Sequence, residues 1–240
     1  MNKYEITPEA KTIESHTLYR IKALRDIPRR GVKAGDLGGW IEAEANLSQE
    51  GHCWIGGNAS VWGTASVEGN ASVEGNARVE GNARVWGDAR VWGDARVWGD
   101  ARVWGNASVG GNARVWGDAR VWGNASVGGN ARVWGDAEVT HTQHVLTIGP
   151  VGSEDQAVTV CRTRVGGHQV VVGCWGPGTL TELVGEVQRR KRQYWGGYPA
   201  PEIARWEAQY RGAIALGESM AEAWAAEAAA EAAAGREPAK

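Results

Sequence analysis

The chain contains no phenylalanine, only seven prolines and only three cysteines in 240 residues, whereas glycine occurs 35 times. This composition is typical of a repeat protein. The cysteines, Cys53, Cys161 and Cys174, are odd in number and form no CxxC pair. That pattern argues against a disulfide framework and favours a reducing compartment, with the cysteines serving as small buried residues.

Long hydrophobic runs are also absent. No run of about 18 apolar residues occurs, and the N-terminal sequence MNKYEITPEAKT lacks the apolar segment of a secretory signal. We therefore expect a cytoplasmic protein that does not cross a membrane. With 26 basic and 28 acidic residues the formal net charge is −2, which argues against a general nucleic-acid binder.

What the sequence does contain is a six-residue repeat. From Ile55 to Val139 an aliphatic residue recurs at every sixth position, with a small residue two positions before it and, in every complete step but the one with Thr64, Asn or Asp three positions after it. The unit is V-x-G-[ND]-A-x. Leu47 and Ile55 are eight residues apart, which predicts a two-residue bulge near Gln49 and Glu50, in a repeat region that begins at Ile41.

A period of six fits no helix, but three short extended segments joined by turns make an 18-residue coil of a parallel β-helix. Valine and alanine, two positions apart, then point into the coil, and Gly-Asn or Gly-Asp supplies each turn. The pattern resembles the hexapeptide-repeat left-handed β-helix, which implies a mainly β solenoid of about five coils. We expect an N-terminal cap before it and an α+β module that ends in helices after it.

Residues 18 positions apart share one face of such a solenoid. At the position directly after each inward aliphatic residue, the first face has Trp62, Glu80, Trp98, Trp116 and Trp134. The second face has Glu68, Trp86, Trp104, Trp122 and Thr140 at this position, and the third face has Gly56, Glu74, Trp92, Gly110 and Gly128. Before the valines, arginines follow the first two faces, among them Arg96, Arg114, Arg102 and Arg120, whereas the third has Ser72, Arg90, Ser108 and Ser126. Two faces therefore carry tryptophan and arginine columns, and the third is nearly bare.

These columns have two interpretations. Stacked tryptophans and arginines can stiffen the surface through ring contacts and cation–π attraction, without any ligand. Aromatic residues in register can also form a binding platform for planar or sugar ligands, or a docking surface. On the second interpretation the candidate binding residues are Trp98, Trp116, Trp134, Trp86, Trp104, Trp122, Arg96, Arg114, Arg102 and Arg120.

The flanking segments divide the chain further. Residues 1–40 are expected to cap the solenoid of residues 41–140, with Tyr19, Ile21 and Ala23 on one side of a strand. Residues 141–198 are expected to form a hairpin and a helix, with a turn at Gly166-Gly167, and residues 199–240 a helix with an alanine-rich tail. In this module Cys161 and Cys174 are predicted on one hairpin face, and Thr179 and Glu182 form a helix capping box before the apolar stripe Leu180, Leu183, Val184 and Val187. In the last helix we expect Ile203, Trp206, Tyr210 and Ile214 on one face. The alanine-rich tail of this helix is expected to be an exposed spacer or a partner-dependent coil.

The flanking motifs GVKAGDLGGWIE, LTIGPVGS and GCWGPGTLTELVGEV, placed around the repeats, resemble a group of bacteriophage and prophage repeat proteins of undefined role. The resemblance extends from about Tyr4 to Leu216 and excludes the alanine-rich tail. It implies a viral origin and an intracellular or virion-associated accessory protein. It implies no chemistry, cofactor or catalytic residue.

The residues themselves argue against catalysis. Hexapeptide acyltransferases and carbonic anhydrases of this fold need histidines on the coils, and none occurs between His52 and His141. His141, His144 and His168 are interpreted as ordinary polar residues and not as a metal site. The repeat aspartates, Asp88, Asp94, Asp100, Asp118 and Asp136, are interpreted as turn formers, and the basic stretch Gln188–Gln193 as a helix end.

We therefore expect a non-enzymatic phage accessory protein whose rigid solenoid binds a host or phage protein, or a small ligand, without cofactor or metal. The alternatives are an anti-defence protein that sequesters a host factor or nucleotide signal, a polymer-forming or virion-associated structural protein, and a disfavoured acyltransferase-like enzyme. A homo-oligomer, dimer or trimer, is expected through the third face or the C-terminal helices, and nucleic acid is disfavoured as a partner.

Overall fold

The computed structural model describes residues 2–234 and divides them into two compact units. Of the described residues, the first unit comprises 2–130 and 140–142, and the second comprises 131–139 and 143–234. Among the described residues no helix is both long and apolar enough to span a membrane.

The first unit begins with an antiparallel sheet of three strands, β1 (Tyr4–Ile13), β2 (His16–Ala23) and β3 (Leu37–Ile41). The short 3-10 helix η1 (Pro28–Arg30) lies between β2 and β3. Leu18, Ile21 and Ala23 are buried, but Tyr19 is 36% exposed. The β2–β3 register shifts between Arg20 and Lys22, with the extra residue in β3; the placement of Tyr19 on one side of the strand with Ile21 and Ala23 stays a prediction.

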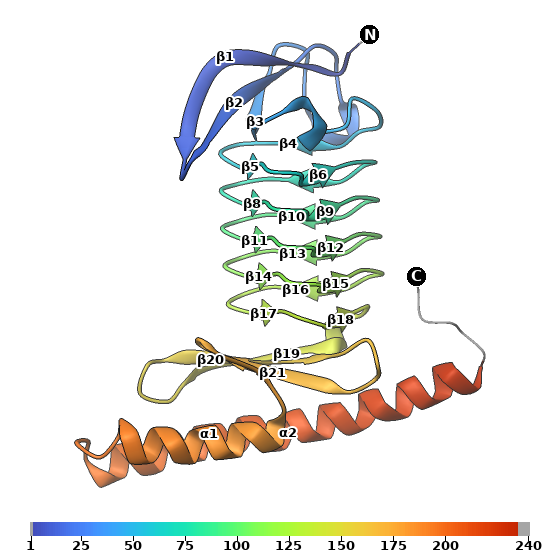
Figure 1. The fold of residues 1–240 in the computed structure, drawn as a ribbon. Helices are drawn as coiled ribbons and strands as arrows, with labels where there is room; N and C mark the ends of the chain where they lie inside the picture. Colours follow the sequence, from blue (N-terminus) through green and yellow to red (C-terminus); the bar gives the residue numbers. More distant parts are fainter. Residues whose placement is uncertain (1, 235–240) are drawn as a thin grey trace. The chain divides into compact units, whose positions relative to one another are not determined.

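Two-residue strands follow, stacked as the rungs of a parallel β-solenoid (Figure 1). Strands 18 residues apart pair in parallel, so that Val97 lies beside Val79 and Val115. Strand β3 pairs with β5 and takes part in the stack, so the solenoid has about six turns rather than the five predicted. The first face comprises β5 (Ser60–Val61), β8 (Arg78–Val79), β11 (Arg96–Val97) and β14 (Arg114–Val115). The second face comprises β6 (Ser66–Val67), β9 (Arg84–Val85), β12 (Arg102–Val103) and β15 (Arg120–Val121). The third face comprises β4 (Trp54–Ile55), β7 (Ser72–Val73), β10 (Arg90–Val91), β13 (Ser108–Val109) and β16 (Ser126–Val127).

The interior of the solenoid consists of the valines and alanines of the repeat. Val97 and Ala95, for example, are fully buried, as the alternation of side chains along a strand requires. The turns depend on glycine for two reasons. Gly87 has φ +70°, and a Cβ there would lie 2.9 Å from the backbone nitrogen of Gly105 in the next turn, so both backbone conformation and stacking exclude a side chain.

The first turn is irregular, as the eight-residue step predicted. The chain bends at Gln49 and Glu50, while Leu47 still bridges to Val67 and Ile55 pairs with Val73. The Oε1 atom of Gln49 accepts a hydrogen bond from the backbone of Lys3 at 2.8 Å. The inserted residues therefore hold the N-terminal segment against the solenoid.

A buried lysine accompanies this insertion. Lys3 is fully buried, and its Nζ atom donates to Cys53 Sγ at 3.0 Å and to the backbone oxygen of Glu50 at 3.2 Å. Burial lowers the pKa of Lys3, against the opposing effect of its hydrogen bond to Cys53. Cys53 is buried, as the sequence predicted.

The second unit begins with the last repeat strands, β17 (Arg132–Val133) and β18 (Glu138–Val139), and continues as an antiparallel sheet. Its strands are β19 (Val145–Val151), β20 (Gln156–Arg162), β21 (His168–Val172) and β22 (Trp175–Gly178), in that order. Ala137 bridges to Thr163, and the backbone of Arg132 donates to Thr159 Oγ1 at 3.0 Å. The end of the repeat is thus closed by the β20 strand and its turn.

The predicted hairpin is confirmed, since β20 pairs with β21 from Val158–Val172 to Arg162–His168 around the Gly166-Gly167 turn. The prediction for its cysteines was half wrong. Cys161 is buried in β20, but Cys174 lies in the turn beyond β21 and is exposed. The strand ends at Val172, so the alternation of side chains does not extend to Cys174.

Two helices, α1 (Leu180–Gln193) and α2 (Ala200–Ala233), pack on this sheet. The capping box at Thr179 and Glu182 is confirmed, with the Glu182 backbone donating to Thr179 Oγ1 at 3.2 Å. Leu180, Leu183 and Val187 are buried, but Val184 is 47% exposed, so the predicted stripe was too wide. Trp206 and Tyr210 are buried in the core as predicted, with Ile203 and Ile214 packed against it.

The alanine-rich end of α2 is not a free spacer. Trp224 is buried, and its indole nitrogen donates to the backbone oxygen of Gln143 at 2.9 Å. Glu227 accepts from His144 at 2.8 Å, and Glu231 accepts from Arg162 at 2.5 Å. The tail is therefore held as far as Glu231 by Gln143 and His144, which precede β19, and by Arg162 of β20; residues 235–240 lie outside the described range.

Candidate functional site

The predicted tryptophan columns are real ladders of parallel rings. On the first face the Trp98 and Trp116 ring centroids are 4.8 Å apart with an angle of 1° between the planes. On the second face the corresponding distances are 4.9 Å for Trp86 and Trp104 and 5.5 Å for Trp104 and Trp122, again at 1°. Trp134 belongs to the second unit, where its backbone oxygen accepts a hydrogen bond from Gln169.

Each ring in a ladder covers part of the next, so the ring faces between rungs are already in contact with tryptophan. Within a ladder the ring edges are therefore what a partner meets first, whereas the indole nitrogen of Trp122 is buried. Ring edges carry the positive part of the aromatic quadrupole, and the N–H is a hydrogen-bond donor. Such a surface suits an acceptor-rich partner better than one that inserts a planar group between the rungs.

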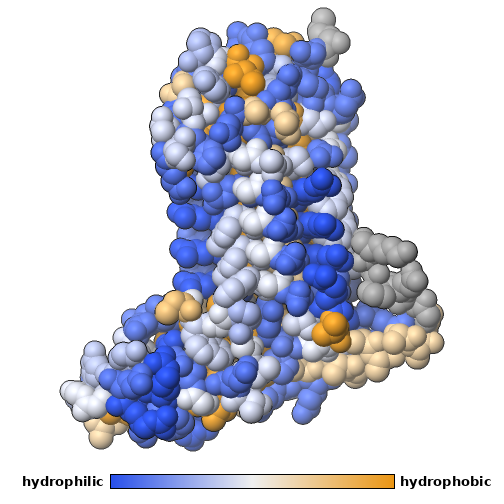
Figure 2. Space-filling view, viewed as in Figure 1, coloured by the Kyte–Doolittle hydropathy of each residue, from blue (hydrophilic) through white to orange (hydrophobic). Residues whose placement is uncertain are grey.

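The arginine columns run beside the ladders. Arg96 and Arg114 are register neighbours on the first face, as Arg84 and Arg102 are on the second. All four are exposed, and within residues 2–234 none forms a hydrogen bond or an ion pair through its side chain. Arg120 is half-buried. Figure 2 shows strongly hydrophilic residues gathered in columns along the solenoid, with paler residues between them.

The corners between faces carry ladders of a different kind. The Nδ2 atom of Asn76 donates to Asp94 at 3.0 Å, and Asn82 donates to Asp100 at the same distance. Asn106 donates to Asn124 at 3.1 Å in the same way. These contacts support the interpretation of the repeat aspartates as turn residues. Asp88 has a different contact, because it forms an ion pair with Arg29 of η1.

The third face explains why tryptophan is missing at Gly110. The Trp92 ring lies over Gly110, where an added Cβ would approach the ring atoms to between 2.2 and 2.6 Å. The Trp92 indole nitrogen also donates to Ser108 Oγ at 3.1 Å. A side chain at position 110 would displace the ring, whereas at Gly128 nothing lies within 4 Å of an added Cβ.

We expect these two glycines to respond differently to the same substitution. Gly110→Ala should lower the free energy of unfolding by roughly 1–3 kcal/mol, because the methyl group overlaps the Trp92 ring. The matched variant Gly128→Ala should change it by less than about 0.5 kcal/mol. Urea denaturation followed by far-UV circular dichroism measures both. Equal effects of the two substitutions would show that Trp92 does not rest on Gly110.

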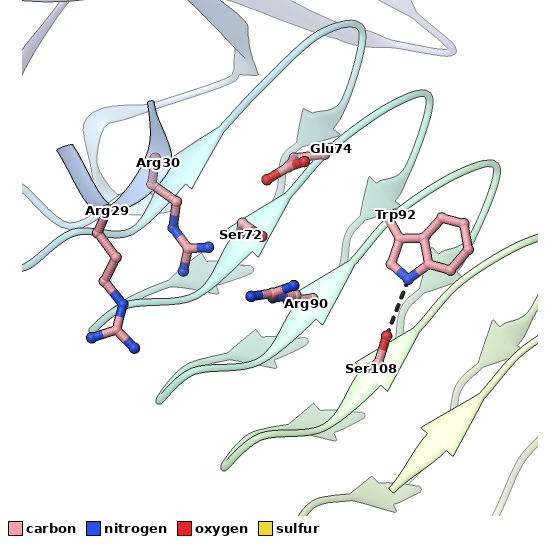
Figure 3. A pocket seen from close by; sticks show the side chains of 7 residues that line it. All are labelled: Arg29, Arg30, Ser72, Glu74, Arg90, Trp92 and Ser108. Carbon is pink, nitrogen blue, oxygen red and sulfur yellow. Dashed lines mark hydrogen bonds between the residues drawn. The ribbon is translucent and has the colours of Figure 1, made fainter. Parts of the chain in front are cut away.

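A cavity of about 530 Å³ on this third face was not predicted. It is lined by Arg29 and Arg30 of η1 and by Ser72, Glu74, Arg90, Trp92 and Ser108 of the solenoid (Figure 3). The repeat pattern predicted Arg90 and Trp92 as isolated residues on a bare face, because it gave no position for η1. An oligomer contact on this face would use the rungs beyond Trp92, near Ser126; the predicted oligomer itself stays a prediction.

In the described part of the chain, no group of three or more His, Cys, Asp or Glu side chains is placed so that it could hold a metal ion. His144 pairs with Glu227, and His168 Nε2 accepts from the backbone of Leu180 at 3.2 Å.

Within the basic stretch Gln188–Gln193, Arg189 and Arg190 both bind Glu186 at 2.7 Å, and Lys191 binds Glu207 at 2.9 Å. The first two arginines hold the pKa of Glu186 below its usual value, against the opposing effect of burial. The stretch is thus largely paired within its own helices.

The fold defines a class of protein: a β-solenoid with an N-terminal hairpin sheet and C-terminal strands and helices. No protein family model matches the chain, and no curated protein matches it. The bacteriophage origin suggested by the flanking motifs therefore stays a hypothesis.

Proposed function

We propose that the protein is a non-enzymatic binding protein whose solenoid presents its first two faces to an acidic partner protein. The observation that carries this proposal is the set of unpaired, exposed arginines in register, Arg96 with Arg114 and Arg84 with Arg102, beside the stacked tryptophans. An intracellular phage accessory role is part of the proposal and is supported by the resemblance of the flanking motifs alone.

Electrostatics favours an anionic partner. Neighbouring strands are about 4.8 Å apart, so arginines in register on one face repel one another. The aspartates of the same repeats lie at the corners, where Asp94 and Asp100 bind asparagine side chains. Carboxylates that bridge successive guanidinium groups would relieve the repulsion and form charge-assisted, bidentate hydrogen bonds.

Rigidity favours recognition over catalysis. The Val and Ala side chains inside the solenoid are fully buried, and each turn is fixed by glycine. A preorganised surface loses little conformational entropy when a partner binds. The coils also lack the histidines that acyltransferases and carbonic anhydrases of this architecture use for catalysis.

Poly-L-glutamate is a defined probe for this surface. We expect the parent protein to bind it with an affinity that falls as salt is raised, because the contacts are ionic. Arg96/Arg114→Gln should weaken binding by roughly tenfold or more, the effect of about 1.4 kcal/mol lost between two charge-assisted contacts. Isothermal titration calorimetry at two salt concentrations measures both effects.

The matched control is Arg192/Arg205→Gln, which removes the same number of exposed arginines from α1 and α2. This variant should bind poly-L-glutamate as the parent does. An equal loss of affinity in the two double variants would show that binding follows net charge alone, and would overturn the assignment of the site to the solenoid faces.

A further inference from the structure

One rung of the third face is built differently from its neighbours. The rung of β10 has Arg90 in the strand and Trp92 just after it, whereas the adjacent rungs have Ser72 and Glu74 on one side and Ser108 and Gly110 on the other. The helix η1 reaches this rung, because Arg29 pairs with Asp88 at its corner. The cavity of about 530 Å³ is thus centred on one exceptional rung, and the two neighbouring rungs and η1 complete its lining.

The cavity is electropositive. Three arginines line it, against one carboxylate, Glu74. Arg29 is neutralised by Asp88, but the Arg30 side chain donates to the backbone oxygen of His52 at 3.3 Å and has no carboxylate partner among the described residues. Arg90 forms no hydrogen bond or ion pair within residues 2–234. Figure 3 shows the Arg30 and Arg90 guanidinium groups pointing into the same space.

The surroundings of Arg30 disfavour its charge. Burial is the main cause that lowers the pKa of Arg30; Glu74 opposes it, Arg90 and Arg29 lower the pKa further, and Asp88 opposes them. A bound anion would offset the desolvation and the repulsion together. The two guanidinium groups offer several N–H donors in planar arrays, which match the oxygens of a phosphate group.

The other end of the cavity is aromatic. Trp92 is 50% exposed, and unlike the ladder tryptophans it has no ring stacked on it, because glycine occupies position 110 in the next rung. Its position is fixed from one side by Gly110 and Ser108. The ring therefore offers an open face to a planar group without a further loss of side-chain freedom.

We propose that this cavity binds a nucleoside 5′-monophosphate, with the phosphate on Arg30 and Arg90 and the base on Trp92. Its volume of about 530 Å³ is within the range of small-molecule sites. Ser72 and Glu74, which lie between the two ends (Figure 3), supply acceptors for the sugar hydroxyls. The proposal is independent of the acidic partner, because that partner is assigned to the other two faces.

Titration calorimetry with AMP, GMP, CMP and UMP tests this directly on the full chain. We expect at least one of the four to bind, and Arg90→Ser and Trp92→Ala each to weaken its binding by roughly tenfold or more. Arg90→Ser inserts the residue found at the equivalent position of both neighbouring rungs, so the variant should fold. Circular dichroism verifies folding of both variants.

The matched controls are Arg102→Ser and Trp104→Ala, which make the same changes in the second-face rung outside the cavity. They should leave nucleotide affinity unchanged. Binding of none of the four nucleotides at millimolar concentration would overturn the proposal, and so would equal losses in the control variants. Inorganic phosphate that binds as tightly as the nucleotide would refute the role of Trp92. Arg90→Ser should still bind poly-L-glutamate, so failure here and failure of the proposed function are distinguishable.

Discussion

The variant Val97→Asp is expected to lose about 4 kcal/mol or more of its free energy of unfolding, a far larger loss than a substitution on the outside of the solenoid should cause. Val97 is fully buried between Val79 and Val115. A carboxylate at that position has no cation or hydrogen-bond donor inside the solenoid, whose lining is Val and Ala. It must therefore be protonated, or the rung must open to water.

The loss should extend beyond a single rung. In a solenoid each turn contacts only its neighbours, so a broken rung removes the template on which both adjacent rungs are stacked. Urea denaturation followed by far-UV circular dichroism should show an earlier transition for this variant. Two neighbouring positions serve as controls. Arg96→Asp places the same carboxylate on the exposed side and should change the free energy of unfolding by less than about 0.5 kcal/mol. Trp98→Ala should lower the free energy of unfolding far less than Val97→Asp does. If Val97→Asp had the same urea denaturation midpoint as the parent protein, the valine would not point inward.

The solenoid could be predicted from the sequence because its geometry repeats in the sequence. A valine at every sixth position, an alanine two residues before it and a glycine at every turn determine which side chains point inward. Three such segments per turn then determine that Trp98 lies in register with Trp116, and Trp86 with Trp104. The ladders followed from counting alone, and so did the change of step between Leu47 and Ile55.

Features that depend on contacts between distant segments could not be predicted in this way. The cavity on the third face requires η1 to lie beside β10, and no period links Arg30 to Arg90. The alanine-rich tail was interpreted from its composition, but three of its side chains, Trp224, Glu227 and Glu231, bind Gln143, His144 and Arg162. A buried tryptophan in an alanine run was the available signal.

The two interpretations of the tryptophan ladders lead to different behaviour in one variant. Removal of the column Trp98/Trp116/Trp134→Ala takes away the Trp98–Trp116 stack, and each stacked pair contributes about 0.5–1.5 kcal/mol beyond its burial. On either interpretation the variant is less stable than the parent. Only the binding interpretation also predicts a loss of affinity, because the ring edges are then part of the contact surface, as tryptophan often is at interfaces.

The most direct measurement is therefore the affinity of Trp98/Trp116/Trp134→Ala for poly-L-glutamate, determined on the same preparation as its free energy of unfolding. The control is Val109→Ala, an inward substitution on the third face that lowers stability by about 1–3 kcal/mol and leaves the outward columns intact. We predict that the tryptophan variant loses roughly tenfold or more in affinity, whereas Val109→Ala binds as the parent does. A tryptophan variant that is destabilised but binds with unchanged affinity would show that the ladder only stiffens the solenoid, and would contradict its role as a binding surface.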